Sequence, residues 1–366
     1  MSPKIGPPLY RLKQPRVCSY PKIQHPASSF FTSCFFFSHF LCKDVPITKN
    51  KEFGVETSMY NRASQFSIGN TMLFKNAFIY RLTQDLESHG EPLAKQLQAR
   101  EFAPCSGIRP SSFGWTSPLG QEGPLIHEVG GCILLCARRE EKVVPLSAIN
   151  DLMIEKIERL QTAEGRSLNS KEKQRIKEET TVELIPRALP RSKQIMGYIA
   201  PRDALLVIDT SSAAESELFI DCLRDSLDSF PVVPPQVREK PTDHYTQWLL
   251  NRELPDNIGL GDQCDLMDPE TGASVSCRHQ DLATGEIRNH IEAGKICTKI
   301  GIRWHGELQV TIDKDLALRQ LKMESSDIPD DDPIAQLDAA LVDTSMTLAR
   351  FLPELFSALG GEAAPK

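Results

Sequence analysis

Two strand-like segments in the C-terminal half follow one another with no room for a helix between them. "KICTKIGIRW" (295–304) and "ELQVTID" (307–313) are separated only by His305 and Gly306. A two-residue connection can join antiparallel strands, whereas parallel strands need a crossover of a dozen or more residues. Most other strand-like segments also come in such pairs rather than alternating with helices. The sequence therefore predicts an α+β fold with antiparallel sheets.

A helical hairpin is expected in the middle of the chain. Apolar residues in 149–160 recur every three or four positions, which predicts one apolar stripe of a helix. A second helix is predicted over 170–184, with the bend near Gly165. The segment before the hairpin, 130–145, is interpreted as a buried strand, a charged turn and a second short strand. After the hairpin, Ser212 and Glu215 form a capping-box pattern that predicts a helix through Leu227.

The charge of the chain is unevenly distributed. The 366 residues are 40% apolar and 25% charged, which is typical of a globular protein of two or three domains, and the net charge is −7. Residues 1–71 hold nine Lys/Arg and three Asp/Glu, so 72–366 hold 33 basic and 46 acidic groups. A DNA-binding protein built on that acidic remainder must gather its cations locally, because its summed field repels DNA.

The sequence contains no motif that predicts an enzyme or a bound cofactor. It has no Gly-x-Ser-x-Gly, His-Glu-x-x-His or Gly-x-Gly-x-x-Gly pattern. Its ten cysteines include no Cys-x-x-Cys, so we expect reduced residues of a cytoplasmic protein rather than metal ligands. A metal-dependent nuclease would have to use Asp209 and the acidic loop 330–332. A lone Asp209 after a strand is more typical of a helix-start cap.

The N-terminal 71 residues are interpreted as a disordered or non-native extension. Their one strongly apolar block, 30–42, is too short to span a bilayer, which needs roughly 20 apolar residues. We therefore expect no membrane association. Met72, directly before a strand pattern, is the expected natural start.

One basic segment stands out, "ELIPRALPRSKQ" (183–194). After its first residue it has no carboxylate, and Arg187, Arg191 and Lys193 alternate as side chains do on one face of a hairpin. Its two prolines stiffen the segment, which suits phosphate contacts because little conformational entropy is left to lose. Leu189 at the expected apex is apolar where solvent is expected. The pattern alone is equally compatible with a structural turn.

In that structural alternative, the cations would pair with acids of the preceding helix such as Glu178 and Glu179. A second basic segment, "SCRHQDL" (276–282), contains Arg278 and His279. Its pattern is weaker and more typical of an ordinary solvated surface.

From Met72 to the end, the chain resembles the family of the bacterial recombination-associated protein RdgC. Seven ordered matches carry the resemblance, and residues 1–71 have no counterpart. The matching motifs are "MLFKNAFIYRL" (72–82), "CARREEKVVP" (136–145), "LIPRA" (184–188), "FPVVP" (230–234), "QDL" (280–282), "NHIEAGKICTKI" (289–300) and "SALGGEA" (357–363).

The resemblance implies a non-enzymatic protein of the bacterial nucleoid. Such a protein binds double-stranded DNA with little sequence preference, restrains RecA-mediated strand exchange, and closes into a ring-shaped homodimer with a basic hole. The implied subunit has three parts: a central sheet domain (72–147 and 186–235, with the C-terminal helix 331–366), a helical tip domain (148–185) and a base domain (236–330).

Two positions depart from the family pattern. Leu189 stands where the family has an aromatic residue, so it lacks aromatic stacking worth ~1–3 kcal/mol per base. His279 and Gln280 stand where the family has Lys-Gln. The DNA-binding residues expected from motif and resemblance are Arg187, Leu189, Arg191, Lys193, Arg278, His279 and Gln280. The alternative reading is an acidic protein-interaction scaffold with incidental DNA contact.

Overall fold

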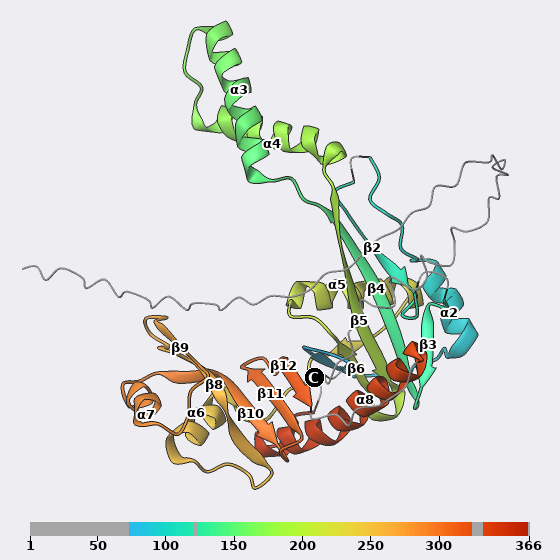
Figure 1. Cartoon of the computed structure of the whole chain (residues 1–366), viewed down its shortest axis with the longest axis vertical. Coiled ribbons are helices and arrows are strands. Elements are labelled where there is room, and N and C mark those ends of the chain that lie inside the picture. Colours follow the sequence, from blue (N-terminus) through green and yellow to red (C-terminus); the bar gives the residue numbers. More distant parts are fainter. Residues whose placement is uncertain (1–72, 108, 121–122, 324–331, 365–366) are drawn as a thin grey trace, which may run out of the picture. The chain divides into compact units, whose positions relative to one another are not determined.

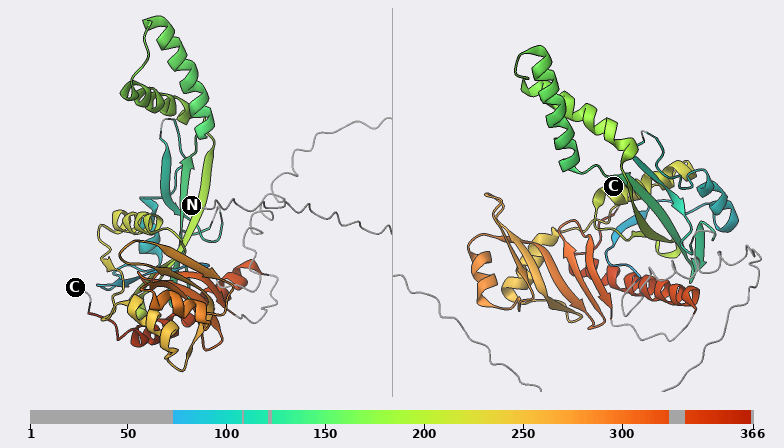
Figure 2. Two further views of the ribbon diagram at one scale, coloured as in Figure 1. Left: turned by 90° about the vertical axis from the view of Figure 1, so that its left-hand side faces the viewer. Right: turned by 45° about the horizontal axis from the view of Figure 1, so that its top comes forward.

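A computed structural model describes residues 73–107, 109–120, 123–323 and 332–364. Within them the chain forms two antiparallel sheets and seven α-helices (Figures 1 and 2). The predicted α+β class with antiparallel sheets is therefore confirmed. The interpretation of residues 1–71 as an extension preceding Met72 lies outside the described residues. No helix among the described residues is both long and apolar enough to cross a bilayer.

The first sheet has seven strands in the order β2-β4-β5-β6-β1-β7, and β3 also pairs with β4. Every pair in it is antiparallel. The strands are β1 (Phe78–Leu82), β2 (Ser111–Thr116), β3 (Ile126–Val129), β4 (Cys132–Lys142), β5 (Pro190–Ala200), β6 (Leu205–Ile208) and β7 (Val232–Val233).

Both faces of this sheet are covered, which follows from the alternation of apolar residues along β5. Ile195 and Ile199 belong to one buried cluster, which includes residues of the helices α2 (Gly90–Gln98) and α5 (Ala213–Leu227). Tyr198 points to the opposite face and belongs to a second cluster. Successive side chains of a strand point to opposite faces, so one apolar strand contributes to two cores.

The second sheet has the order β12-β11-β10-β8-β9, and all its strand pairs are antiparallel. The cluster that contains Tyr198 also includes buried residues of this second sheet and of the C-terminal helix α8 (Pro333–Ala358). The elements are α6 (Pro241–Asn251), β8 (Ile258–Met267), β9 (Ser274–Arg278), α7 (Gly285–Glu292), β10 (Ile296–Trp304), β11 (Leu308–Asp313), β12 (Leu318–Met323) and α8 (Pro333–Ala358). The hairpin predicted around His305 and Gly306 is confirmed as β10–β11.

The helical hairpin is confirmed as α3 (Leu146–Glu164) and α4 (Ser170–Leu184), which pack against each other (Figure 1). Gly165 ends α3 with a φ of 64°, a left-handed conformation that glycine adopts without strain. At the start of α4, Asn169 and Glu172 form a reciprocal capping box. The hairpin is inserted between β4 and β5 of the first sheet.

Two local predictions were wrong. Segment 130–145 contains no charged turn between two strands, because its charged residues continue the single long strand β4. Segment 183–194 is not a hairpin either. A 3-10 turn, η1 (Ile185–Arg187), extends α4, and β5 begins directly at Pro190. Both errors assigned a chain reversal to residues that the tertiary structure uses to lengthen a strand or a helix.

Of the two hydrogen bonds of the capping box predicted at Ser212, only the one to the Ser212 side chain is formed. The Ser212 side chain accepts a hydrogen bond from the Glu215 backbone N–H at 3.4 Å, and α5 ends at Leu227 as expected. The Glu215 carboxylate does not complete the box, because it binds side chains from β5 and from the loop after β6. The Glu215 carboxylate is thereby held beside Lys193, one of the candidate site residues.

Candidate nucleic-acid interface

The long strands β4 and β5 each have an apolar half and a charged half. Their antiparallel register pairs the apolar halves with one another and sets 138–142 beside 190–194. Segments 138–142 and 187–193 together hold six Lys/Arg and two Glu. We call residues 138–142 and 187–194 the basic ribbon. The ribbon thus brings together cations from two segments that are separated in sequence by residues 143–186.

Lys193 lies on the face of the ribbon that α5 approaches. Its Nζ donates to Glu215 Oε2 at 2.5 Å, and Arg139, directly opposite Lys193, places Nη1 3.7 Å from Glu215 Oε1. Thr210 Oγ1 also donates to this carboxylate at 2.5 Å. Burial alone would raise the pKa of Glu215, but these hydrogen bonds and the two cations outweigh it and lower the pKa. Lys193 is therefore already neutralised in part.

Arg187 and Arg191 have different surroundings. Both side chains are exposed, and neither makes an ion pair or a side-chain hydrogen bond within the described part of the chain. The residue opposite Arg191 is Glu141, but its carboxylate accepts from Arg139 at 2.9 Å. These two guanidinium groups are the ones most available to an external anion.

Leu189 lies between the 3-10 turn and β5 and is 85% exposed. It was expected at a hairpin apex, whereas it occupies the junction where the helical pair returns to the sheet. A large apolar side chain so fully exposed gains no burial energy within the subunit. It is therefore available to pack against another molecule.

Glu178 and Glu179 do not pair with the basic segment. Near the end of α4, the pKa of the Glu183 carboxyl is lowered mainly by Lys156, and Arg187 lies close enough for its guanidinium to help lower it. Glu178 accepts from Gln174 at 2.9 Å, and Glu179 accepts from Arg175 at 2.8 Å. Both acids are engaged within α4. The carboxylate that does pair with the ribbon, Glu215, comes from a different helix.

Sequence reasoning missed the contribution of β4 to the ribbon. Arg138 points to the face opposite Lys193, donates to Ser192 Oγ at 2.9 Å and lies 4.8 Å above the Phe102 ring. Lys142 Nζ donates to the Gly107 carbonyl at 2.8 Å. The signal was present in "RREEK" (138–142), but interpreting it as a turn hid its place opposite β5.

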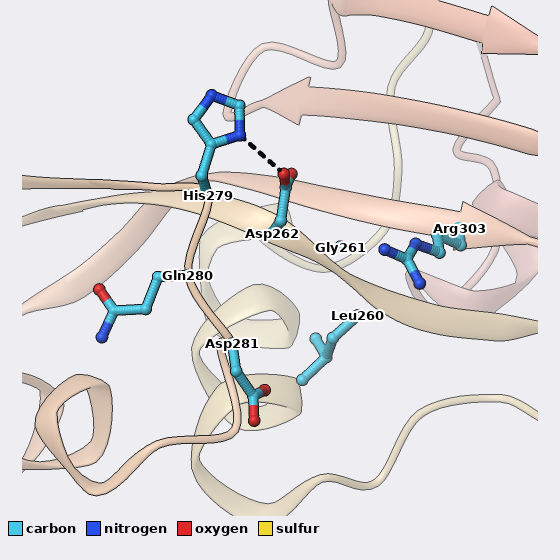
Figure 3. A pocket seen from close by; sticks show the side chains of 7 residues that line it. All are labelled: Leu260, Gly261, Asp262, His279, Gln280, Asp281 and Arg303. Carbon is cyan, nitrogen blue, oxygen red and sulfur yellow. Dashed lines mark hydrogen bonds and ion pairs between the residues drawn. The ribbon is translucent and has the colours of Figure 1, made fainter. Parts of the chain in front are cut away.

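The second basic segment lies on the other sheet, at the end of β9, and its cationic side chains are paired. Arg278 Nη1 donates to Asp265 Oδ1 at 2.8 Å. His279, with a side chain 92% exposed, has Nδ1 3.2 Å from Asp262 Oδ2 (Figure 3). Burial would raise the pKa of Asp265, but hydrogen bonds from Arg278 and Ser276 and nearby cations lower it.

The side chain of Gln280 points away from Asp262 and Asp281 (Figure 3). Its Nε2 donates to Glu286 Oε2 at 2.9 Å. A hollow of about 380 Å³ beside it is lined by Leu260, Gly261, Asp262, His279, Gln280, Asp281 and Arg303. Two carboxylates face one guanidinium in this lining, so the hollow does not favour a phosphate.

The sequence of this chain is similar to those of known proteins over most of its length. The family model described as "Putative exonuclease, RdgC" matches residues 72–362. The chain belongs to the RdgC family. Relatives named recombination-associated protein RdgC include those of Aeromonas hydrophila (39% identity over 299 residues), Tolumonas auensis (39% over 301) and Pseudomonas aeruginosa (35% over 304). These alignments cover 80–81% of the chain and 99–100% of each relative.

Membership in the RdgC family implies a role in recombination. The curated relatives carry the name of a recombination-associated protein, whereas the family description names an exonuclease. The absence of enzymatic activity therefore remains a prediction from sequence.

Asp209, the acid on which a nuclease would depend, has a local structural role. Its Oδ1 accepts from the Asn76 backbone N–H at 3.0 Å, and burial raises its pKa. It does not cap α5, because the N-cap is Ser212. Among the described residues, no three His, Cys, Asp or Glu side chains are arranged to hold a metal ion. Asp330 and Asp331 of the acidic loop lie outside the described residues.

Proposed function

We propose that this RdgC-family chain binds double-stranded DNA with little sequence preference. The observation that carries the proposal is the basic ribbon, in which Arg187 and Arg191 are exposed and form no ion pair or side-chain hydrogen bond within the described residues. Guanidinium groups on ordered backbone bind phosphates well, because little chain entropy is lost on binding. Leu189 beside them offers an apolar contact to a base step.

Phosphate contact explains how an acidic protein can hold a polyanion. At physiological salt the Debye length is ~8 Å, so carboxylates elsewhere on the surface are screened from a phosphate at the ribbon. Phosphates carry no sequence information, so binding through them tolerates any sequence. Each phosphate contact releases counterions, so affinity falls steeply with salt.

We further propose that two subunits close into a ring whose hole is lined by the ribbons, with the tip, central and base parts implied by the family resemblance. Exposed apolar side chains on and beside the helical hairpin support a contact between copies. They are Val143, Leu146, Ile154, Leu160 and Val182. Several exposed apolar residues on one element are typical of protein interfaces. Sedimentation equilibrium should give a dimer, which Leu146→Asp with Ile154→Asp should dissociate.

The first test is the affinity of the full chain for unrelated duplexes of equal length across a salt series. We expect similar affinities for all sequences and a log–log salt slope of several units. A flat salt response or strong preference for one sequence would contradict the proposal. No binding even at low salt would favour the interaction scaffold.

In the bacterial nucleoid, coating duplex DNA in this way would restrain RecA-mediated strand exchange. A strand-exchange reaction with purified RecA tests this step. Added protein should slow product formation, whereas the variant that combines Arg187→Ala with Arg191→Ala should not. Equal inhibition by both proteins would show that DNA binding through the ribbon is not the cause.

The family description makes exonuclease activity the second candidate. End-labelled linear duplex should be incubated with the protein and Mg²⁺ or Mn²⁺, with a chelator as control. DNA binding without loss of label supports the binding protein. Metal-dependent release of nucleotides that Asp209→Asn abolishes would favour the nuclease.

A further inference from the structure

Two cysteines face each other across the edge of the second sheet. Cys264 on β8 and Cys277 on β9 are direct partners in the antiparallel register (strands labelled in Figure 1). Both side chains contact the same buried cluster, so they lie on the same face of the sheet. Among the seven described cysteines, which are all free thiols, no other pair is aligned in this way by strand register.

The spacing of paired strands suits a disulfide. Directly opposed residues of antiparallel strands have Cα atoms about 4.5–5.5 Å apart, within the roughly 4.4–6.8 Å range of disulfides. The Cβ atoms must approach by roughly 1 Å from the usual cross-strand distance. The edge strand β9 can make this movement, because β8 is its only partner in the sheet.

The two thiols differ in access, which assigns their roles. Cys277 is partly exposed, whereas Cys264 is 0% exposed and burial raises its pKa to about 12. Cys277 is therefore the thiol that an oxidant in solution reaches. The raised pKa of Cys264 leaves little of it as thiolate, so its attack on Cys277 is expected to be the slower step.

We propose that Cys264 and Cys277 form a reversible oxidation site. The Cys277 thiolate attacks a peroxide oxygen, and the O–O bond breaks to give the sulfenic acid and, after protonation, one water. The Cys264 sulfur then attacks the Cys277 sulfur, forming the S–S bond and releasing the hydroxyl as a second water. Two thiols lose two electrons, and one hydrogen peroxide becomes two waters. A dithiol reductant reverses the change.

Cys297 is the competing partner and is less suitable. It lies on β10 opposite Leu266, and its Sγ donates to the Lys299 carbonyl at 3.2 Å. It is also fully buried, so no oxidant reaches it from solution. The link is therefore expected between β8 and β9 rather than between β8 and β10. A disulfide between β8 and β9 would restrict the movement of the edge strand β9, which ends at Arg278.

Peptide mapping of the full chain tests the site directly. The protein is reduced, desalted, treated with hydrogen peroxide, alkylated and digested without reductant. Trypsin leaves both cysteines in residues 253–278, because no Lys or Arg lies between them. That peptide should lose two hydrogens and escape alkylation. A glutamate-specific protease cuts after Glu270, and its two fragments should stay joined until dithiothreitol is added.

Two variants provide matched controls. Cys277→Ser should abolish the link, whereas Cys105→Ser, which changes the other partly exposed described cysteine, should keep it. Proteolysis within the connecting loop 268–273 should slow several-fold on oxidation and recover on reduction. A link from Cys277 to Cys297 or to a second chain, stable sulfinic acid at Cys277, or no oxidation would each overturn the proposal. DNA binding plays no part in any of these measurements.

Discussion

In the basic ribbon, Arg187 and Arg191 form no ion pair within the described residues, whereas Arg278 and His279 on the other sheet each have an aspartate partner. For Arg191, which lies on β5, the difference comes from the neighbouring strand. Beside β5 lies β4, whose charged half is itself rich in cations. Beside β9 lies β8, which carries Asp262 and Asp265. Whether a cation is available to DNA thus depends on the residues across the sheet more than on its neighbours in sequence.

The largest effect is expected from Arg187→Ala with Arg191→Ala. Each lost phosphate contact should weaken binding ~10-fold, or ~100-fold for the pair, and lower the salt slope by about 2. Fluorescence anisotropy with two unrelated duplexes measures both quantities. The control is Arg159→Ala with Arg175→Ala, which removes two exposed arginines already paired with Glu155 and Glu179. A comparable loss of DNA affinity in both variants would show that unpaired and paired arginines do not differ in their contribution to binding.

A stability effect is expected from Glu215→Gln, which removes the one acid paired with Lys193. We expect ~1–2 kcal/mol of destabilisation in urea unfolding at pH 7, because two cations lose a buried partner. The folded pKa of Glu215 is lowered. Its contribution is therefore full above the unfolded value of about 4.3 and is lost as pH falls through the lower folded value.

The difference between wild type and Glu215→Gln should accordingly shrink in that acidic window. Glu217→Gln, an exposed position on the same helix, serves as control and should change stability little. A difference that persists unchanged below the folded pKa would mean that packing, rather than the carboxylate charge, accounts for it.

A smaller effect is expected when the second segment is made to resemble the ribbon. Asp262→Asn with Asp265→Asn removes the acids paired with His279 and Arg278. DNA affinity should rise roughly 3- to 10-fold, since exposed ion pairs are worth about 0.2–1 kcal/mol each. The control, Asp256→Asn with Asp315→Asn, makes the same change in net charge at exposed positions. An equal rise in the control would assign the gain to net charge alone.

The smallest effect is expected from Arg278→Ala with His279→Ala. Because these side chains are already paired, their removal should weaken DNA binding by less than about 2-fold. Anisotropy at the same salt as for the ribbon variant gives the direct comparison. A loss approaching that of Arg187→Ala with Arg191→Ala would mean that DNA displaces the aspartates.

Much of the fold could be predicted from local pattern. The helical stripe in 149–160 and the glycine at 165 predict α3 and its end, because helix period and left-handed caps are properties of neighbouring residues. The same reasoning failed at 183–194 and at 138–142. Charged residues and prolines there are typical of turns, but pairing of β4 with β2 and β5 made 138–142 part of a strand, and pairing with β4 did the same for 190–194.

The sequence by itself determined the antiparallel class, the helical hairpin and the family, and it singled out Arg187, Leu189, Arg191 and Lys193 as candidates. Only the tertiary structure decided that Lys193 meets Glu215, that Arg191 meets no available acid, and that Cys264 faces Cys277. Ion pairs and thiol pairs depend on separations of a few ångströms in space. Strand register sets those separations, and it joins segments that local sequence patterns cannot relate.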